Sequence, residues 1–306
     1  MAAAEVRAFI GDMQRRHGFL PEELKKMFAR LKANEQVIRL MDAPADPNKK
    51  VYWKEYRKKL LKPANILRGV DFMKAHVAAL KRAEESFGVP SEIITAILGV
   101  ETRYGAYLGN FHIAEALATL AFFYPRRGAE FRQELESFLL YVREQGADLL
   151  SFRGSFAGAF GMLQFLPSNA RRFAVDFDGN GRQDSFSPVD SIGSIGKFLK
   201  HYGWRREHGI AYPVTVSGNM TPIIQNSQEN GYKPTFSQAE LAVVGVHIKG
   251  ETAAGERYLP VDLENRYDTE YRAGTDNFYA LTRYNKSFKY AAAVLDLSRA
   301  IRGRLK

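Results

Sequence analysis

The first 88 residues carry a helical pattern of apolar positions. The segments PEELKKMFARL and ILRGVDFMKAHVAALKRAEESFG have apolar residues at the 3.6-residue spacing of one helix face, and the second ends at Gly88. The N-terminal stretch MAAAEVRAFIGDMQRRHG indicates an amphipathic helix rather than a signal peptide. We therefore expect helices to fill residues 1–88.

The pattern changes from helical to alternating in the second half of the chain. Between about 207 and 275, short alternating segments such as AYPVTVSG, LAVVGVHIKG and RYLPVDL are broken by Gly, Asn and Pro, which predicts a small antiparallel sheet. A last helix, SFKYAAAVLDLSRAI, closes the chain. The fold class is therefore mainly α, an α+β fold in which helices pack on helices beside a small β domain. Further helices are predicted at 113–123, 128–145, 161–173 and 188–202.

Composition narrows the range of partners. The chain has 306 residues, 45% of them hydrophobic, which is enough for a sizeable core. Its formal net charge of +10 favours polyanions, which include nucleic acid and the acidic cell wall. The lack of cysteine excludes disulfides, thiolate nucleophiles and cysteine-ligated metals. No apolar run approaches the roughly 20 residues that a membrane span requires.

One carboxylate interrupts the apolar face of a predicted helix. This helix starts at Pro90 and Ser91, whose hydroxyl could cap free backbone N–H groups, and Gly105 is expected to end it. Glu101 follows Ile97 at i+4 and so continues the apolar row. A core-facing charge of this kind is either a general acid or a carboxylate at a fraying helix end.

The general-acid interpretation depends on the pKa of Glu101. Burial and the negative end of the helix dipole both disfavour the ionised form, so both raise the pKa. At the ordinary pKa of about 4.3 only roughly 0.2% of a Glu is protonated at pH 7, whereas at about 6.5 roughly a quarter is. The alternative is that the side chain turns to solvent or pairs with Arg103.

Two further segments contain polar groups among aromatic rings. In RGSFAGAFGMLQFLPS, residues 153–168, Ser155 and Gln164 offer uncharged hydrogen-bonding groups beside phenylalanines, which suits sugar rings; the alternative is a tightly packed loop before a helix. In DNFYALTRYNKSFKY, residues 276–290, the tyrosines are either core residues or a stacking wall for sugars. The spacing does not separate these alternatives.

The segment DFDGNGRQDSFSPVD, residues 176–190, begins like a calcium-binding loop. Oxygen ligands stand at positions one, three, five and seven, with Gly181 at the turning position six. Position twelve is Ser187 and not a bidentate Glu, so binding is expected to be weak and structural. The alternative is an Asx-rich turn without a metal. The candidate ligands are Asp176, Asp178, Asn180, the backbone carbonyl of Arg182, and Asp190.

Five blocks of sequence together resemble the membrane-bound lytic transglycosylase B family. They are GVETRYG, ALATLAFFYPRR, GSFAGAFGMLQFLPS, AVDFDGNGRQD with PVDSIGSIGKFLKHYGW, and NFYALTRYN, in the order of the family and within residues 50–303. The resemblance implies a lysozyme-like core, an α-helical domain and a small β domain around a peptidoglycan-binding groove. It also implies cleavage of the MurNAc-β-1,4-GlcNAc bond with formation of a 1,6-anhydroMurNAc end.

The resemblance gives a domain division and residue roles. It implies a helical domain over 1–88 with a contribution from the C-terminal helix, a catalytic core over 89–205, a β domain over 206–275, and a return to the core over 276–306.

Glu101 matches the single catalytic carboxylate, which acts first as acid and then as base. The calcium loop of the family is unusually long, which accommodates Asp190. Phe198 stands where the family often has Tyr, so that only stacking remains there. The other implied substrate contacts are Ser155, Gln164, Phe165, Tyr124, Arg126, Arg127, Tyr279, Tyr284, Asn285 and Tyr56, with the two arginines near peptide or acidic parts of the strand.

The resemblance also implies partners and a location. We expect no cofactor for the chemistry, a structural Ca²⁺, and peptidoglycan glycan strands as the partner, together with other cell-wall enzymes and without nucleic acid. The location implied is the periplasm, with an outer-membrane lipid anchor in the precursor that this chain does not contain.

Three alternative functions stay open: a muramidase that uses water, a non-catalytic wall-binding scaffold, and a nucleic-acid binder favoured by charge alone.

Overall fold

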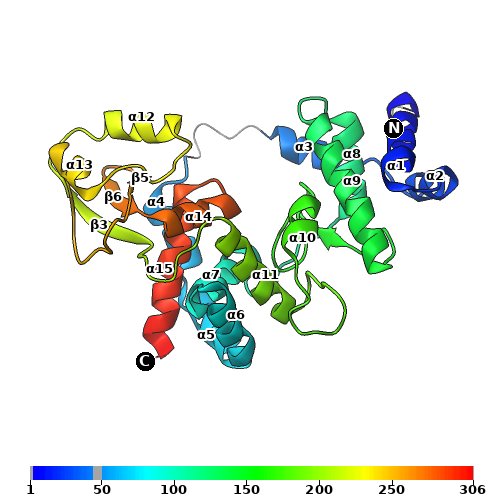
Figure 1. Cartoon of the computed structure of the whole chain (residues 1–306). Helices are drawn as coiled ribbons and strands as arrows, with labels where there is room; N and C mark the ends of the chain where they lie inside the picture. The colour runs from blue at the N-terminus through cyan, green and yellow to red at the C-terminus, as the bar shows by residue number, and fades with distance from the viewer. Residues whose placement is uncertain (1–2, 44–49, 306) are drawn as a thin grey trace. The chain divides into compact units, whose positions relative to one another are not determined.

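A computed structural model describes residues 3–43 and 50–305 of the chain (Figure 1). The chain forms two compact units, and each is built from two separate stretches of sequence. The first unit contains Met1–Pro47 and Gly105–Ser194, and the second contains Asn48–Tyr104 and Ile195–Lys306. The division into four consecutive domains that the resemblance implies stays a prediction.

The first unit is built mainly from helices. Its short strands β1 (Phe111–His112) and β2 (Arg153–Gly154) pair in antiparallel fashion. The apolar helix α8 (Ile113–Phe123) packs along α9 (Gly128–Gln145). The rings of Phe9, Phe28 and Phe122 meet edge to face with centroids 5.8–6.1 Å apart. The helices are α1 (Ala3–His17), α2 (Pro21–Ala29), α3 (Glu35–Asp42), α8 (Ile113–Phe123), α9 (Gly128–Gln145) and α10 (Pro167–Phe173); α11 (Pro188–His201) begins in this unit.

The second unit combines helices with a four-stranded antiparallel sheet. The strand order is β4 (Val246–Ile248), β3 (Ala211–Val216), β6 (Thr269–Gly274) and β5 (Leu259–Glu264). Among the described residues, no helix of either unit combines the length and the apolar character needed to cross a membrane. The helices of the second unit are α4 (Trp53–Leu60), α5 (Pro63–Ala75), α6 (Val77–Phe87), α7 (Ser91–Thr102), α12 (Thr221–Glu229), α13 (Gln238–Val243), α14 (Asp276–Tyr284) and α15 (Phe288–Leu305).

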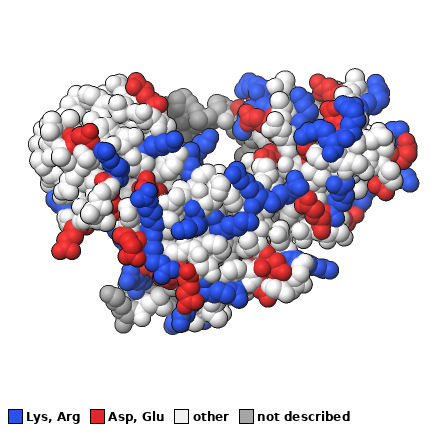
Figure 2. Space-filling view, in the orientation of Figure 1, with Lys and Arg blue, Asp and Glu red and all other residues white. Residues whose placement is uncertain are grey.

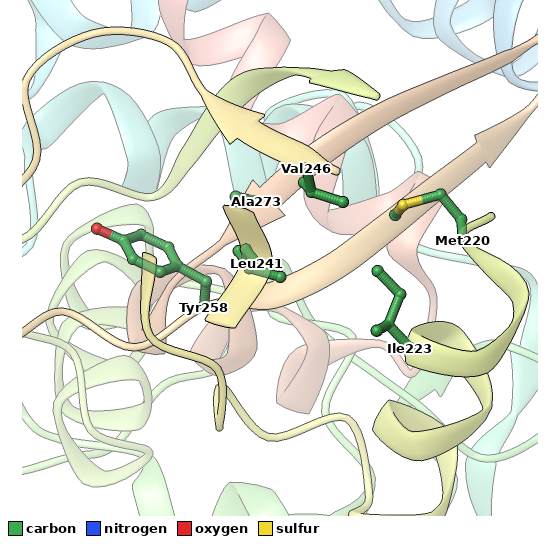
Figure 3. Packing of buried hydrophobic residues seen from close by; sticks show 6 residues of the cluster. All are labelled: Met220, Ile223, Leu241, Val246, Tyr258 and Ala273. Carbon is green, nitrogen blue, oxygen red and sulfur yellow. The ribbon is translucent and has the colours of Figure 1, made fainter. Parts of the chain in front are cut away.

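A small apolar core joins the sheet to α12 and α13. Figure 3 shows Met220 and Ile223 at the start of α12 and Leu241 of α13 against Val246 of β4 and Tyr258. All five side chains are buried. Because each short helix contributes only one or two of these residues, the helices and the sheet depend on one another for burial.

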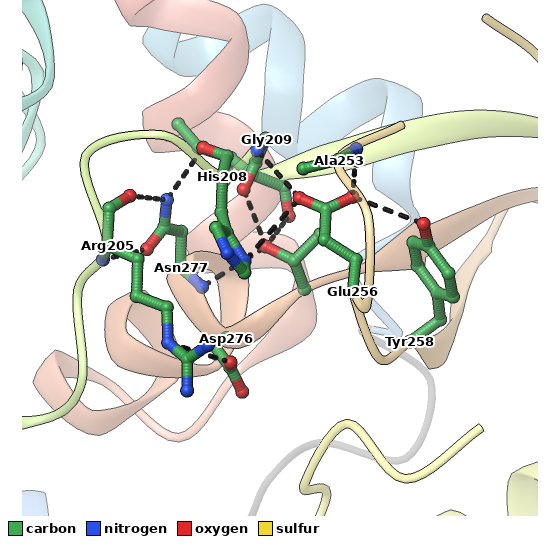
Figure 4. A network of polar contacts seen from close by, with 10 residues as sticks. Arg205, His208, Gly209, Ala253, Glu256, Tyr258, Asp276 and Asn277 are labelled. Carbon is green, nitrogen blue, oxygen red and sulfur yellow. Dashed lines mark hydrogen bonds and ion pairs between the residues drawn. The ribbon is translucent and has the colours of Figure 1, made fainter. Parts of the chain in front are cut away.

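A buried carboxylate holds the loops next to this sheet (Figure 4). Glu256 accepts hydrogen bonds from the backbone N–H of Gly209 at 3.0 Å, from the backbone N–H of Ala253 at 3.3 Å, and from the hydroxyl of Tyr258 at 3.1 Å. His208 Nδ1 lies 3.7 Å from the same carboxylate. Glu256 thus connects the loop that precedes β5 with the segment that precedes β3.

The structure confirms the mainly helical fold and most of the predicted helices. The helices at 113–123 and 128–145 have the predicted bounds, and α11 ends one residue before the predicted end. The predicted helix 161–173 was wrong in its first part, because Gly161 and Gln164 have positive φ angles of 70° and 49° and the helix begins only at Pro167.

Two other sequence predictions need correction. The long helix predicted up to Gly88 is two helices, α5 and α6, that meet at His76, whose φ of −122° is not helical. The predicted strand segment LAVVGVHIKG is divided, since its first residues belong to α13 and only Val246–Ile248 forms a strand. Gly245 between them has a φ of 79°, which separates the helix from the strand.

We expect Glu256→Ala to destabilise the second unit by about 3 kcal/mol, because three donors would lose their acceptor inside the protein. Urea unfolding followed by fluorescence of Trp53 and Trp204, both in this unit, measures the change. Glu251→Ala removes an exposed carboxylate from the same loop and serves as the control. A loss no larger than that of the control would contradict the role of Glu256.

Candidate active site

Glu101 lies in the last turn of α7, a helix with eight buried residues among its twelve. This helix packs against α15 and α5. Its neighbours in the apolar row, Ile97 and Leu98, are fully buried, whereas Glu101 retains partial exposure. The structure therefore places this carboxylate on the apolar face of the helix, as the sequence predicts.

The end of α7 differs from the sequence prediction. Ser91 does not cap the start of α7; its hydroxyl donates to Glu84 instead, at 2.7 Å. Gly105 does not end the helix, which stops at Thr102, and Arg103 takes the left-handed conformation with a φ of 51°. Tyr104 follows with a φ of 63°, which is rare for a bulky residue.

The ring of Tyr104 explains how this strained helix end is held. A Cβ added to Gly99 would lie 2.5 Å from Tyr104 Oη, and one added to Gly69 would lie 2.6 Å from it. The two glycines thus provide the space in which the ring packs between α7 and α5, and its hydroxyl donates to the carbonyl of Asn65 at 3.0 Å. The carboxylate of Glu101 is positioned by this packing immediately before the helix end.

The carboxylate of Glu101 accepts a hydrogen bond from one of two stacked tyrosines. The hydroxyl of Tyr290, on α15, donates to Glu101 Oε1 at 2.7 Å. The ring of Tyr284 stacks on the ring of Tyr290, with centroids 6.3 Å apart and an interplanar angle of 12°. In the described part of the chain Glu101 forms no ion pair, so the alternative of a pair with Arg103 has no support.

Burial raises the pKa of Glu101 from 4.5 to about 7, and the hydrogen bond from Tyr290 opposes the shift. Burial also raises the pKa of Tyr284 and of Tyr290 well above the ordinary value, and the charge of Glu101 adds to both shifts. The pKa of Tyr56 is raised by burial and by the charge of Glu101. The tyrosines therefore remain protonated donors, while Glu101 exchanges its proton near neutral pH.

The other predicted groups of the second unit lie on α14, α11 and just beyond. The guanidinium of Arg283 lies over the ring of Tyr279, 5.0 Å from its centroid, and Asn285 is exposed at the end of α14. The ring of Phe198 is buried, with its centroid 4.9 Å from that of Tyr284. The buried ring of Phe198 thus packs against the ring of Tyr284.

The first unit contains the glycine-rich segment around Ser155 and Gln164. Ser155 Oγ accepts from the backbone N–H of Ala159 at 3.0 Å, and Gln164 Nε2 donates to the carbonyls of Leu108 and Gly161 at 3.2 and 3.0 Å. Both side chains are half-buried. A Cβ at Gly154 would lie 2.1 Å from the carbonyl oxygen of Ala159, so close backbone packing accounts for this glycine.

The remaining candidates of the first unit are either buried or exposed on the surface. Tyr124 ends α8 and is buried, as is Phe165. Arg126 and Arg127 are exposed; Arg126 Nη1 lies 3.3 Å from a carboxylate oxygen of Asp42, and Arg127 pairs with Glu130 at 2.7 Å. The two arginines are thus exposed and paired with carboxylates, while the two rings lie within the packed unit.

Three aspartates of the first unit could hold a metal ion. One oxygen each of Asp176, Asp178 and Asp190 lies within 4.8 Å of the others. Asp190, in the first turn of α11, is buried and accepts from the backbone N–H of Phe177 at 2.8 Å and of Asp184 at 2.8 Å. Burial raises its pKa, and these hydrogen bonds oppose the shift. The convergence of carboxylate oxygens fits a hard cation.

Sequence analysis left Tyr290 as either a core ring or a stacking ring and did not connect it with Glu101. The tyrosine-rich segment 276–290 contained it, but its hydrogen-bond partner is 189 positions away in sequence. The available signal was its position six residues after Tyr284, in the same motif. The structure brings Glu101, Tyr284 and Tyr290 together within the second unit.

Comparisons with known proteins show the family of this chain. The family described as the transglycosylase SLT domain matches residues 2–299. The membrane-bound lytic murein transglycosylase B of Escherichia coli (strain K12) is 39% identical over 96% of this chain and 81% of its own length. The structure of the E. coli lytic transglycosylase Slt35 in complex with calcium is 38% identical, covers 98% of this chain and 94% of its own, and gives a TM-score of 0.88. The soluble lytic transglycosylase SltB1 of Pseudomonas aeruginosa is 36% identical, covers 99% of this chain and 100% of its own, and gives a TM-score of 0.89.

The chain belongs to the transglycosylase SLT domain family. The predicted resemblance and the predicted lysozyme-like fold class are confirmed by these matches.

The raised pKa of Glu101 predicts a pH-dependent gain in stability for Glu101→Gln. In the unfolded chain the carboxyl ionises near 4.5 and in the folded chain near 7, so the folded form binds more protons between these values and stability falls as pH rises through them. Replacing Glu by neutral Gln removes a cost of about 3 kcal/mol that is fully present above pH 7.

Urea unfolding of Glu101→Gln and of the unchanged protein at pH 4 and at pH 8 measures this gain. We expect the difference between the two proteins to grow by about 3 kcal/mol from the lower to the higher pH. Glu85→Gln, which changes an exposed carboxylate of α6, is the control. A difference that is equal at both pH values would show that Glu101 has an ordinary pKa.

Proposed function

We propose that this chain is a lytic murein transglycosylase that cleaves the MurNAc-β-1,4-GlcNAc bond of peptidoglycan and leaves a 1,6-anhydroMurNAc end. The observation that carries the proposal is the partly buried Glu101, whose pKa is near 7 and which accepts a hydrogen bond from Tyr290. Membership of the family and the activity in the name of the E. coli relative support the substrate class.

The geometry around Glu101 suits a general acid. Because the hydroxyl of Tyr290 donates to Oε1, the acidic proton belongs on Oε2, which faces away from that hydrogen bond. From Oε2 the proton passes to the glycosidic oxygen as the bond from that oxygen to C1 breaks. The N-acetyl group of the substrate stabilises the cation at C1.

The second half of the reaction uses the carboxylate that the first half produces. Glu101 takes the proton of the C6 hydroxyl while the C6 oxygen forms the new bond to C1, so the acid is regenerated and no water enters. Glycosidases that use two carboxylates require a second group for this step. Here the nucleophile is already tethered to the sugar, which avoids much of the entropy cost of capturing water.

The substrate contacts are part of the proposal. In the second unit, Tyr56, Tyr279, Tyr284 and Asn285 bind the glycan near Glu101, and the buried Phe198 holds Tyr284 in place. In the first unit, the half-buried Ser155 and Gln164 offer hydrogen bonds to the glycan, and the exposed Arg126 and Arg127 bind acidic parts of the strand. The buried rings of Tyr124 and Phe165 shape this unit from within.

The proposed site of action is the periplasm, where murein lies. The name of the E. coli relative describes it as membrane-bound, which supports attachment to a membrane; a lipid anchor in the outer membrane stays a prediction. The positive net charge supports adhesion to an acidic wall, and Figure 2 shows Lys and Arg spread over the visible face with fewer Asp and Glu among them. Association with other cell-wall enzymes stays a prediction.

Product analysis of digested murein sacculi tests the proposed reaction. We expect the unchanged protein to release muropeptides with anhydro ends and Glu101→Gln to release them at least a thousandfold more slowly, because an amide has no acidic proton to give. Mass spectrometry distinguishes these products from those of a water-using muramidase, which are one water heavier. Reducing ends without anhydro product would contradict the transglycosylase proposal, and unchanged release by Glu101→Gln would contradict the role of Glu101.

We also propose that the aspartate cluster binds Ca²⁺ and stabilises the first unit without taking part in the chemistry. The ligands are Asp176, Asp178, Asn180, the carbonyl of Arg182, and Asp190, and the calcium complex of the E. coli relative supports the metal.

Calcium is expected to raise the melting temperature of the protein relative to chelator. A stabilisation of about 2.7 kcal/mol follows when free Ca²⁺ is 100 times its dissociation constant. Asp178→Asn should remove this shift, and Asp71→Asn, at an exposed position of α5, should retain it. Identical melting curves with calcium and with chelator would contradict the proposed site.

A further inference from the structure

The four-stranded sheet of the second unit has a gap between β3 and β6. In their register these two strands pair only as far as Pro213 and Arg272. Beyond that point residues 214–216 pair with β4, on the other side of β3, and residues 269–271 pair with β5, on the other side of β6. In the part of the chain that the structure describes, each of these two segments therefore has one edge without a strand beside it. We call the space between them the sheet notch.

The hydrogen bonds of β3 show which of its backbone groups face the sheet notch. Successive residues of an antiparallel strand direct their N–H and C=O groups to opposite sides. The carbonyl of Pro213 accepts from the backbone N–H of Lys249 at 2.9 Å, on the side of β4. By this alternation the backbone groups of Val214 and Val216 point away from β4 and into the notch.

The same alternation applies to β6. The N–H of Thr275, directly after β6, donates to the carbonyl of Ile210 at 3.0 Å across the closed end of the notch. The backbone groups of Tyr271 and Thr269, an even number of positions earlier, therefore point toward β3. A pocket of about 650 Å³ is lined by these residues of both strands, which is a volume in the range of ligand pockets. The notch thus has room beside two unpaired strand edges.

The two faces of the sheet notch differ in character. On one face the side chains of Val214 and Tyr271 pack against the apolar core of Figure 3. Arg272, the next residue of β6, points to the other face, where its Nη1 donates to Asp296 of α15 at 2.9 Å. Arg299 of α15 also lines the pocket. An added strand with alternating apolar and polar side chains would match both faces.

Arg299 gives the closed end of the notch a positive charge. Its Nη2 lies 3.5 Å from the carbonyl oxygen of Ala211, and among the described residues it forms no ion pair. The nearby carboxylate of Asp296 is already shared by Arg57, at 2.6 Å, and by Arg272. The excess of cations favours an anionic group at this end.

We propose that the sheet notch binds the extended C-terminal segment of a partner protein, which adds a strand between β3 and β6 and places its terminal carboxylate on Arg299. Addition of a strand to an unpaired sheet edge is a general mode of peptide recognition. The paired residues 211–213 close the notch at one end, so a chain that enters it has to end there. A C-terminus brings a carboxylate to Arg299, whereas an N-terminus would bring a like charge.

The probe for this site is the peptide acetyl-Ser-Val-Thr-Val-Thr-Val with a free C-terminal carboxylate. It is titrated into ¹⁵N-labelled protein, and NMR follows the backbone amides of Val216 and Tyr271. We expect saturable shifts at both amides. The same peptide with a C-terminal amide should bind about tenfold more weakly, because it has no charge for Arg299.

Arg299→Gln tests the cation without changing the peptide. We expect this variant to bind the free-acid peptide about tenfold more weakly and the amide peptide as the unchanged protein does, because the charge pair is then already lost. Arg304→Gln, at an exposed position later on α15, is the matched control and should bind both peptides normally.

A methylated peptide tests the strand pairing itself. Replacement of the N–H of the central valine by an N-methyl group removes a donor that an added strand requires, so we expect about tenfold weaker binding. Equal binding of the methylated and unmethylated peptides would show that no strand is added.

The other outcomes also decide the proposal. An absence of saturable shifts, equal binding of the acid and amide peptides, or shifts confined to His247 on β4 would overturn it. These comparisons use the unchanged protein and therefore do not depend on the folding of Arg299→Gln. None of them involves Glu101, so their failure would leave the transglycosylase proposal intact, and failure of that proposal would leave the peptide site standing.

Discussion

The site depends on a carboxylate that α7 carries into apolar surroundings at its last turn. Ile97 and Leu98, which precede Glu101 in the row, are fully buried, and burial is the largest cause of the rise in the pKa of Glu101 to about 7. That position lowers the stability of the folded protein above pH 4.5. At such pH values the carboxyl of the unfolded chain ionises freely, whereas burial disfavours its ionisation in the folded chain. The buried position is also what allows one side chain to serve as acid and then as base near neutral pH.

The surrounding residues tune this carboxylate through burial and one hydrogen bond, and it has no ion pair in the part of the chain that the structure describes. Tyr290 provides one neutral hydrogen bond, which moderates the rise in pKa without the large fall that a cation would cause. Tyr284 and Phe198 pack behind Tyr290 in turn. The strained end of α7, held by Tyr104 against Gly99 and Gly69, fixes the direction in which the carboxylate leaves the helix. Aromatic packing thus sets both the position and the acidity of Glu101.

Much of the helical part of the fold could be predicted from the chain alone. Helices α8 and α9 have the predicted bounds because their apolar positions recur without interruption. The short helices α12 and α13 were missed, since each is stable only through a few contacts with the sheet, which a local pattern does not report. The helix start at 161 was wrong because positive φ angles at Gly161 and Gln164 follow from packing rather than from periodicity.

The candidate site could likewise be predicted only in part from the sequence. Glu101 stands out in sequence because its i−4 neighbour is apolar, whereas Tyr290 does not, because its partner is distant in the chain. Phe198 belongs to a recognisable motif, but only the structure shows that its ring is buried behind Tyr284. Positions in a motif indicate which residues matter, and tertiary packing decides which of them face a ligand.

The most direct test is a ¹³C NMR titration of the side-chain carboxyl of Glu101 in protein with labelled glutamate, with the resonance assigned by its absence in Glu101→Gln. The account predicts an inflection near pH 7. An inflection near pH 4.5, in a protein that remains fully active, would contradict it.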